Sequence, residues 1–225
     1  MPDELLERLR HFHTQAFPPH RTQFQSLVED GQHPKTLFIG CSDSRLVPYL
    51  LTGAGPGELF LVRNVGAFVP PYDGDTHGTA AAIEFAVLAL HVQRIVVCGH
   101  SHCGGIRALY GDVPPQARHL AAWLEFGRAA TLPVALPGPE VLRRTEQRAV
   151  VLQLERLMDY PMVREAVEAR RLTLHGWHYV IEDGEVHVFD VQQGQFIPAS
   201  TSEHAGTGPY PGWDEPVPAN AAASA

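Results

Sequence analysis

The distribution of apolar residues along the chain predicts an alternation of short strands and helices. Short apolar runs bounded by turn residues favour strands, and they cover residues 36–40, 58–65, 94–99, 172–181 and 185–191. Apolar residues spaced three and four apart favour helices, and they cover residues 3–13, about 24–28, 75–91, 104–110, 116–130, 139–158 and about 161–171. This order predicts an α/β fold, a mainly parallel sheet with flanking helices. The turn pair Asp183-Gly184 between the last two strands predicts an antiparallel hairpin at one edge.

The two ends of the chain differ from its central part. The N-terminal patterns are amphipathic, with Leu5, Leu9 and Phe12 on one helical stripe that needs a surface to cover. After Pro198 the sequence is rich in Ser, Thr, Gly, Pro and Ala and loses its periodicity, which is typical of disordered segments. We therefore expect a single domain over residues 1–191, including a helical arm at 1–35, and a C-terminal tail at 192–225.

Composition and charge exclude several classes of protein. With 225 residues, of which 44% are hydrophobic, the chain is not disordered throughout. Its longest apolar stretch, 79–90, is interrupted by Glu84 and is shorter than a membrane span. A net charge of −8 disfavours nucleic acid and anionic lipid as partners. The first residues are acidic and polar, unlike a secretory signal, so a cytoplasmic protein without membrane or nucleic-acid partners is expected.

Polar motifs directly follow two of the predicted strands. Cys41-Ser42-Asp43-Ser44-Arg45 follows residues 36–40, and His100-Ser101-His102-Cys103-Gly104-Gly105 follows residues 94–99. If the two strands are neighbours, both motifs meet at one edge of the sheet. Cys41, His100 and Cys103 would then offer two thiolates and one imidazole, a donor set that suits zinc. Three protein ligands leave a fourth position open, as in catalytic zinc sites.

Asp43 and Arg45 lie beside this predicted zinc site. The Asp43 carboxylate could bind the zinc directly, or it could accept a hydrogen bond from zinc-bound hydroxide and orient it. Arg45 can hold a carboxylate through two parallel hydrogen bonds and would keep Asp43 off the metal. Gly104 and Gly105 open a helix beside the site and leave backbone N–H groups close enough to meet an oxyanion.

Other interpretations of these motifs remain open at this point. His102 could replace His100 as a ligand, although it lies nearer the following helix. Cys98, in the middle of a strand, is more typical of a small buried core residue. The glycine-rich segment 99–105 could cradle a phosphate, but it lacks the spacing of the known phosphate-binding loops. A Cys-x-Asp-x-Arg segment alone could also be a loop with a salt bridge.

Together the two motifs resemble those of the β-class carbonic anhydrases, CSDSR and HSHC standing some sixty residues apart. The likeness extends through 57–73, 78–90, 95–109 and 174–186. It implies zinc as cofactor and reversible hydration of CO2 to bicarbonate, with ligands at Cys41, His100 and Cys103 and a catalytic pair at Asp43 and Arg45. It also implies substrate-binding roles for Gln32, Phe60, Val65 and Phe85, which match a glutamine and apolar residues of the family. Gly104, whose backbone N–H could meet an oxyanion, is expected to bind substrate as well.

The resemblance further implies an assembly, because the aromatic residue at Phe85 comes from a neighbouring subunit in this family. A homodimer or an assembly of dimers is expected, and the amphipathic arm would pack on the partner. Rival functions keep the same fold: an enzyme acting on carbonyl sulfide or carbon disulfide, or a non-catalytic zinc or bicarbonate-sensing module. The Asp43 and Arg45 pair argues against a purely structural zinc site, which has no need of it.

Some bacterial members of the family close their site when bicarbonate occupies a non-catalytic pocket. That pocket uses an arginine and a tyrosine, matched here by Arg63 and Tyr179, and a tryptophan. Phe38 stands at the tryptophan position and has no N–H to offer the anion. A buried anion that lacks one donor is less stable by about 1 to 3 kcal/mol. We therefore expect the site to stay open near neutral pH, with Asp43 held by Arg45.

Overall fold

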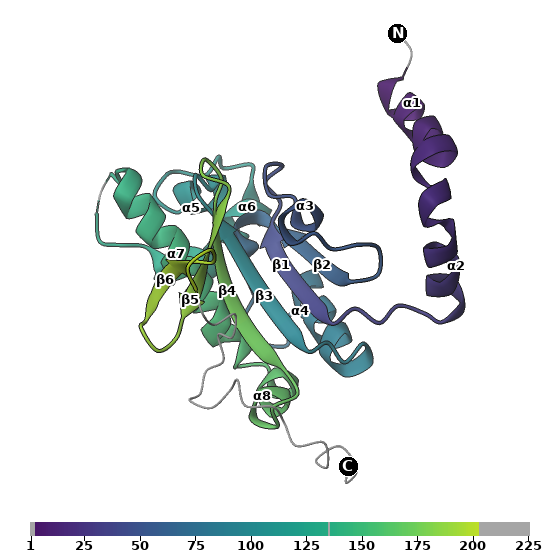
Figure 1. The fold of residues 1–225 in the computed structure, drawn as a ribbon. Helices are drawn as coiled ribbons and strands as arrows, with labels where there is room; N and C mark the ends of the chain where they lie inside the picture. The colour runs from purple at the N-terminus through teal and green to yellow at the C-terminus, as the bar shows by residue number, and fades with distance from the viewer. Residues whose placement is uncertain (1–2, 135, 203–225) are drawn as a thin grey trace.

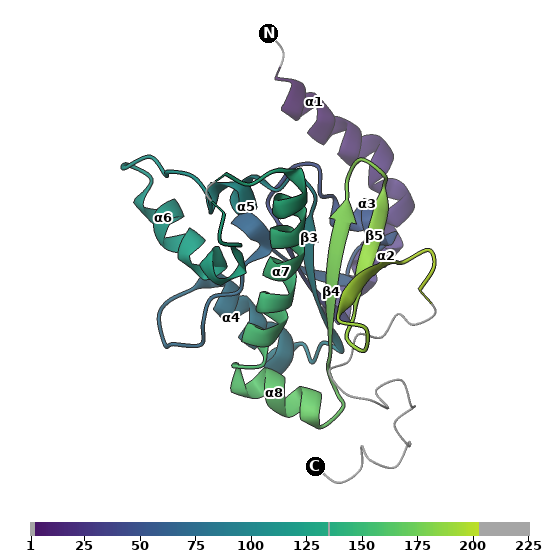
Figure 2. The same cartoon turned by 90° about the vertical axis from the view of Figure 1, so that its left-hand side faces the viewer.

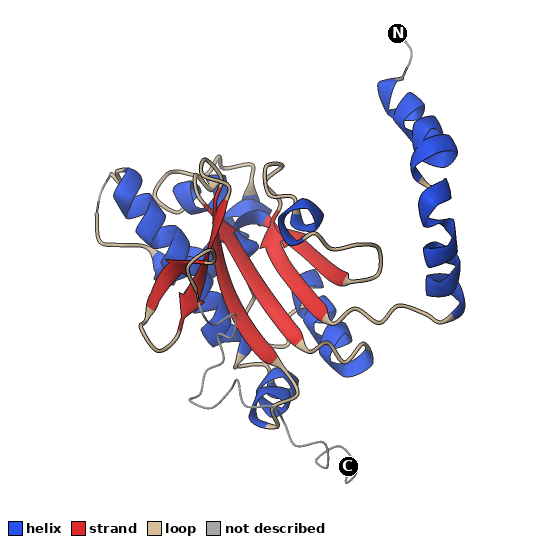
Figure 3. Cartoon of the chain, viewed as in Figure 1, coloured by secondary structure: helices blue, strands red, loops and turns tan. Residues whose placement is uncertain are grey.

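The computed structural model describes residues 3–134 and 136–202, which form one six-stranded sheet with helices around it (Figure 3). Its strands are β1 (Thr36–Cys41), β2 (Leu59–Asn64), β3 (Arg94–His100), β4 (Thr173–Val180), β5 (Glu185–Asp190) and β6 (Gln195–Pro198). Their spatial order is β2-β1-β3-β4-β5-β6. The first four strands of this order are parallel, and β5 and β6 are antiparallel to their neighbours. The predicted mainly parallel sheet with an antiparallel edge is confirmed.

Helices lie against the sheet and along its carboxyl edge, except for the first two, which stand apart from it (Figures 1 and 2). They are α1 (Glu4–His11), α2 (Arg21–Glu29), α3 (Pro48–Thr52), α4 (Gly78–Glu84), α5 (Gly104–Ala108), α6 (Arg118–Leu124), α7 (Pro139–Leu157) and α8 (Pro161–Glu168). Shorter π or 3-10 turns cover Phe12–Ala16, Pro18–His20, Val65–Ala67, Phe85–Ala89 and Glu125–Ala130. Within the described ranges, no helix is both long and apolar enough to cross a membrane.

The two faces of the central strands contribute to two apolar clusters. Ile95 and Val97 of β3 pack into one cluster with residues of α4, α7 and α8. The alternate residues Val96 and Cys98 belong to the other, together with Phe38 of β1 and side chains of α5 and α6. Side chains on both faces are therefore buried, as the continuous apolar run of 94–99 predicts for a central parallel strand.

The structure differs from the sequence-based prediction at several boundaries. Helix α4 begins at Gly78 rather than residue 75, because His77 is still extended. Helix α3 lies between two predicted strands, in a segment where the sequence pattern predicts no helix: Pro48 begins it, and Gly53, with φ +66°, ends it in the left-handed region. Strand β6 lies beyond the predicted domain end at residue 191, so that boundary is corrected to include it. Residues 203–225 of the predicted tail lie outside the described residues.

The N-terminal arm stands to one side of the sheet (Figure 1). Helices α1 and α2 form as the amphipathic pattern predicts, but neither contains a buried residue. Apolar side chains on them remain exposed, including Leu5 at 68% and Val28 at 83%. The arm contacts the body where Gln23 Nε2 donates to the Pro56 carbonyl at 3.2 Å. Packing of the arm on a partner subunit stays a prediction.

Candidate metal centre

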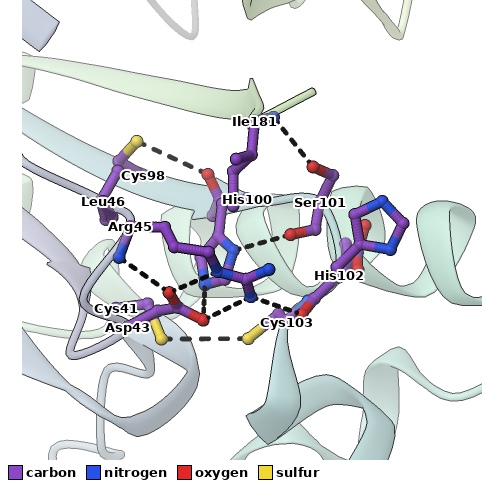
Figure 4. Close-up of polar contacts among 12 residues, drawn as sticks. Cys41, Asp43, Arg45, Leu46, Cys98, His100, Ser101, His102, Cys103 and Ile181 are labelled. Carbon is purple, nitrogen blue, oxygen red and sulfur yellow. Dashed lines mark hydrogen bonds and ion pairs between the residues drawn. The ribbon is translucent and has the colours of Figure 1, made fainter. Parts of the chain in front are cut away.

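The two polar motifs meet at the carboxyl edge of the sheet because β1 and β3 are adjacent parallel strands (Figure 4). Cys41 is the last residue of β1 and His100 the last residue of β3, while Cys103 precedes the first residue of α5. All three side chains are buried. Their potential ligand atoms lie within 4.8 Å of one another, and the two sulfur atoms are 3.9 Å apart.

This cluster fits zinc in donor type and in geometry. Two thiolates bound tetrahedrally at the usual zinc–sulfur length would lie about 3.8 Å apart, close to the observed separation. His100 Nδ1 is 2.8 Å from the Ser101 carbonyl, which can only accept, so Nδ1 carries the proton. Nε2 is buried and has no hydrogen-bond partner. A buried, unprotonated ring nitrogen beside two thiols is the arrangement that a metal completes.

The other candidate ligands lie elsewhere. His102 is largely exposed, and its Nε2 is 3.4 Å from Glu182 Oε1 rather than among the sulfur atoms. Cys98 is fully buried in the apolar cluster beneath the site. Burial also raises the pKa of the Cys98 thiol, which disfavours the thiolate that metal binding requires. Neither residue therefore lies where it could bind a metal together with Cys41 and Cys103.

The two thiols of the cluster differ in how readily they lose a proton. A hydrogen bond from Cys103 lowers the pKa of Cys41 to about 4, helped by His100 and by the backbone N–H groups of Asp43 and Gly66. The same contact, burial and the charge on Cys41 raise the pKa of Cys103. Burial lowers the pKa of His100, but the proximity of Cys41, the Ser101 carbonyl and the charge on Asp43 outweigh burial and raise it. A divalent cation bound between the two sulfur atoms would displace the proton that Cys103 otherwise retains.

Asp43 is held firmly by Arg45 beside the cluster. Arg45 Nε donates to Asp43 Oδ1 at 2.9 Å and Nη2 donates to Oδ2 at 2.7 Å, and the Arg45 backbone N–H adds a third bond at 3.0 Å. Arg45 Nη2 also donates to the His102 carbonyl at 3.1 Å, which connects the two motifs. These bonds lower the pKa of Asp43. Its Oδ2 lies 3.8 Å from His100 Nε2, at the edge of the candidate site.

Two further contacts hold the loops that carry the site. The Arg63 guanidinium donates to the carbonyls of Cys41, Asp43 and Leu46, which fixes the loop after β1. Ser101 Oγ donates to Glu182 at 2.6 Å, which ties the loop after β3 to the end of β4. The loops on both sides of the cluster are thus braced by side chains from other elements.

The structure brings only part of the predicted substrate-binding set to this site. Val65 lies beside the start of α5, where a Cβ on Gly105 would be 3.0 Å from its side chain. Its carbonyl accepts a hydrogen bond from Trp123 Nε1 at 2.7 Å. Gly104 lies at the same edge of the sheet, with nothing within 4 Å of its Cβ position. Gly104 thus directly follows the candidate ligand Cys103, and Val65 lies beside the same turn of α5.

Gln32, Phe60 and Phe85 do not lie at the site of their own chain. Gln32 precedes the amino end of β1, whereas Cys41 ends that strand, and six residues of strand span about 17 Å. Phe60 pairs with Leu37 near the amino end of β1. The Phe85 ring lies 5.8 Å from the Phe60 ring. Within one chain, these three residues form no part of the metal site.

The sequence analysis missed Glu146 of α7, which reaches the site from the helical layer. Glu146 is 4% exposed, and its Oε1 accepts the backbone N–H of Cys103 at 3.1 Å. A signal was present in the sequence, because Glu146 lies on the same helical stripe as the buried residues Ala149, Val150 and Gln153. A carboxyl group on a buried stripe needs a polar partner.

Comparisons with known proteins agree with this geometry. The chain matches the family model described as "Carbonic anhydrase" over residues 36–186. It is 38% identical to a carbonic anhydrase of Synechococcus elongatus, covering 81% of this chain and 70% of that protein. It is 39% identical to a carbonic anhydrase of Pseudomonas aeruginosa, covering 89% and 92%.

Similarity to solved structures identifies the class of carbonic anhydrase. The structure of the β-carbonic anhydrase CcaA has a TM-score of 0.81 and 37% identity over 86% of this chain and 90% of that chain. A structure described among two tetrameric β-carbonic anhydrases from Sordaria macrospora has a TM-score of 0.72 and 30% identity over 86% and 96%. By family model, relatives and fold, the chain belongs to the β-class carbonic anhydrases.

Proposed function

We propose that this carbonic anhydrase hydrates CO2 at a zinc ion held by Cys41, His100 and Cys103, with Asp43 and Arg45 as its catalytic pair. The observation that carries the proposal is the bare, buried Nε2 of His100 beside two thiols and the Asp43 carboxylate. Zinc bound there supplies a Lewis acid that lowers the pKa of a coordinated water.

The remaining chemistry belongs to residues of the chain. Asp43, ionised and held by two bonds from Arg45, accepts a hydrogen bond at the edge of the site and orients its donor. The lowered pKa of Asp43 keeps it from taking up the proton itself. The bonds from Arg45 would keep the Asp43 carboxylate from binding the metal. Val65 offers an apolar wall for CO2, and Gly104 leaves room beside it.

We further propose that the working enzyme is a homodimer or an assembly of dimers. Gln32, Phe60 and Phe85 would then line the site of a partner subunit, because they lie far from the site of their own. Phe85 is 49% exposed, and the exposed apolar residues of the arm also offer a surface to a second copy. Sedimentation of the full chain should show no monomer at micromolar concentration. A monomer with full CO2 hydration activity would contradict the assembly.

We also propose a cytoplasmic location for the enzyme, and no nucleic-acid or membrane partner, on the basis of its thiols and its net charge. All three cysteines are free, and two of them must remain reduced to bind zinc. This favours the cytoplasm, where thiols stay reduced. The net charge of −8 supports a small-molecule substrate rather than nucleic acid or a membrane surface.

The zinc site is tested by cysteine substitution with a matched control. Cys41→Ser and Cys103→Ser should lose most zinc by metal analysis and most CO2 hydration by stopped flow. Cys98→Ala removes an equally buried cysteine that lies outside the cluster and should retain one zinc per chain. Full zinc content and activity in either serine variant would refute the ligand assignment. A zinc-loaded wild type without CO2 hydration would favour a non-catalytic module.

A further inference from the structure

Glu146 makes two hydrogen bonds that link the candidate metal site to β4 of the sheet. Its side chain is 3% exposed, and burying a carboxylate is costly unless its oxygens are paired. Oε1 accepts the backbone N–H of Cys103 at 3.1 Å. Oε2 is 3.1 Å from Nε2 of His178, a fully buried residue of β4. Both oxygens are therefore engaged, one of them by a candidate metal ligand.

The contact with Cys103 falls where the backbone direction sets the thiol position. Cys103 caps α5 with an extended conformation, φ −68° and ψ 120°, and its own side chain makes no capping bond. An N-cap residue donates no helical hydrogen bond from its backbone N–H, and this buried group would lack a partner without Glu146. The peptide held by Glu146 carries the sulfur that lies 3.9 Å from Cys41.

His178 fixes Glu146 from the opposite side. The ring of His178 packs edge-on against Phe196 of β6, with centroids 6.2 Å apart. A continuous path of contacts therefore runs from β6 through His178 and Glu146 to Cys103. Neither His178 nor Glu146 can move without leaving a buried polar group of the Glu146 carboxylate unpaired, which is unfavourable.

We propose that Glu146, held by His178, is a positioning residue that sets the direction of the Cys103 thiolate and thereby the affinity of the site for zinc. This inference rests on the proposed function, because it takes Cys103 as a zinc ligand. Residues that hold ligands from outside the coordination sphere typically change metal affinity 10- to 100-fold when they are replaced. A loss of this size is expected when both hydrogen bonds of Glu146 are removed.

The test compares zinc affinity, by chelator competition, and the absorption spectrum of the cobalt-substituted protein. Glu146→Leu should weaken zinc binding by about 10- to 100-fold and shift the thiolate-to-cobalt band. Glu146→Gln retains an oxygen that accepts the Cys103 N–H and should recover most of the affinity. His178→Phe should weaken zinc binding in the wild-type background but have little further effect in Glu146→Leu, because it acts through Glu146.

Gln153 provides a matched control on the same helix. It is 1% exposed, and its Oε1 accepts the backbone N–H of Val69 at 2.8 Å, away from the cluster. Gln153→Leu should lower thermal stability but leave the zinc affinity and cobalt spectrum unchanged. Equal effects of Gln153→Leu and Glu146→Leu, or no effect of the latter, would overturn the inference. If Glu146→Leu does not fold, His178→Phe with unchanged zinc affinity and cobalt spectrum overturns it. A wild type that binds no zinc would refute the proposed function as well.

Discussion

Adjacent glycines at the start of α5 should respond in opposite ways to the same substitution. A Cβ on Gly105 would lie 3.0 Å from Val65 Cγ1, 3.1 Å from Gly66 N and 3.3 Å from Gly66 Cα. A Cβ on Gly104 would meet nothing within 4 Å. Gly105→Ala therefore forces the first turn of α5 away from the turn after β2, whereas Gly104→Ala adds a methyl group in open space.

The magnitude depends on whether the neighbours of Gly105 can move. Val65 is 38% exposed and can change rotamer. Gly66 cannot, because its φ of +79° is fixed in a tight turn and its own Cβ position lies 2.6 Å from the Phe68 ring. Overpacking of this kind lowers the free energy of unfolding by about 1 to 3 kcal/mol. Replacing glycine by alanine in a helix without steric conflict raises it by up to about 1 kcal/mol.

Urea denaturation of the two variants measures this difference directly. Zinc content should follow the same order, since the Gly66 N–H helps to lower the pKa of Cys41 and would be displaced in Gly105→Ala. Gly104→Ala should retain the zinc content of the wild type. Equal unfolding free energies for the two variants would show that the packing argument at this turn is wrong.

Three other predictions concern the site itself. Asp43→Asn and Arg45→Ala should retain zinc but lose about 100- to 1000-fold in kcat, with a matching fall in kcat/KM; a near-normal stopped-flow rate would contradict the pair's role. Zinc binding to metal-free protein near pH 7 should release about one proton, because the raised pKa of Cys103 leaves its thiol protonated until a metal displaces the proton, so affinity falls as pH falls. Calorimetry in buffers of different ionisation enthalpy measures this release, and a pH-independent affinity would refute it. Bicarbonate should not steepen the pH–rate profile, and cooperative steepening would refute an open site in which Arg45 holds Asp43.

The sheet and the meeting of Cys41, His100 and Cys103 could be predicted because they rest on local signals. The apolar run of 94–99 is too continuous for a surface strand, and a turn directly after it places His100 at the strand end. Once β1 and β3 are taken as neighbours, Cys41 and His100 must meet, because parallel strands share a carboxyl edge. Strand β6 has only four residues and ends at Pro198, which is too short for a clear alternation, and it was missed.

Other features of the site could not be predicted because distance along the chain does not indicate distance in space. Gln32 is nine positions from Cys41 but lies beyond the opposite end of the same strand, so it cannot serve the site of its own chain. Glu146 is 43 positions from Cys103 yet accepts its backbone N–H. Helix packing brings Glu146 to the site, and no local pattern specifies which turn of α7 meets α5. Only the unusual carboxyl group on a buried stripe marks the position.

The contacts of Arg63 give a physical reason for the site to remain open. Its guanidinium is engaged by three carbonyl groups of the loop that carries Asp43, and each such bond contributes about 1 kcal/mol net. An anion that recruits Arg63 must first break these bonds. Phe38, fully buried and edge-on to Trp177 at 6.1 Å, supplies no donor to offset that loss. The bonds that would have to break are those that hold the Asp43 loop. Closure of the site is therefore opposed both by the loss of these bonds and by the missing donor at Phe38.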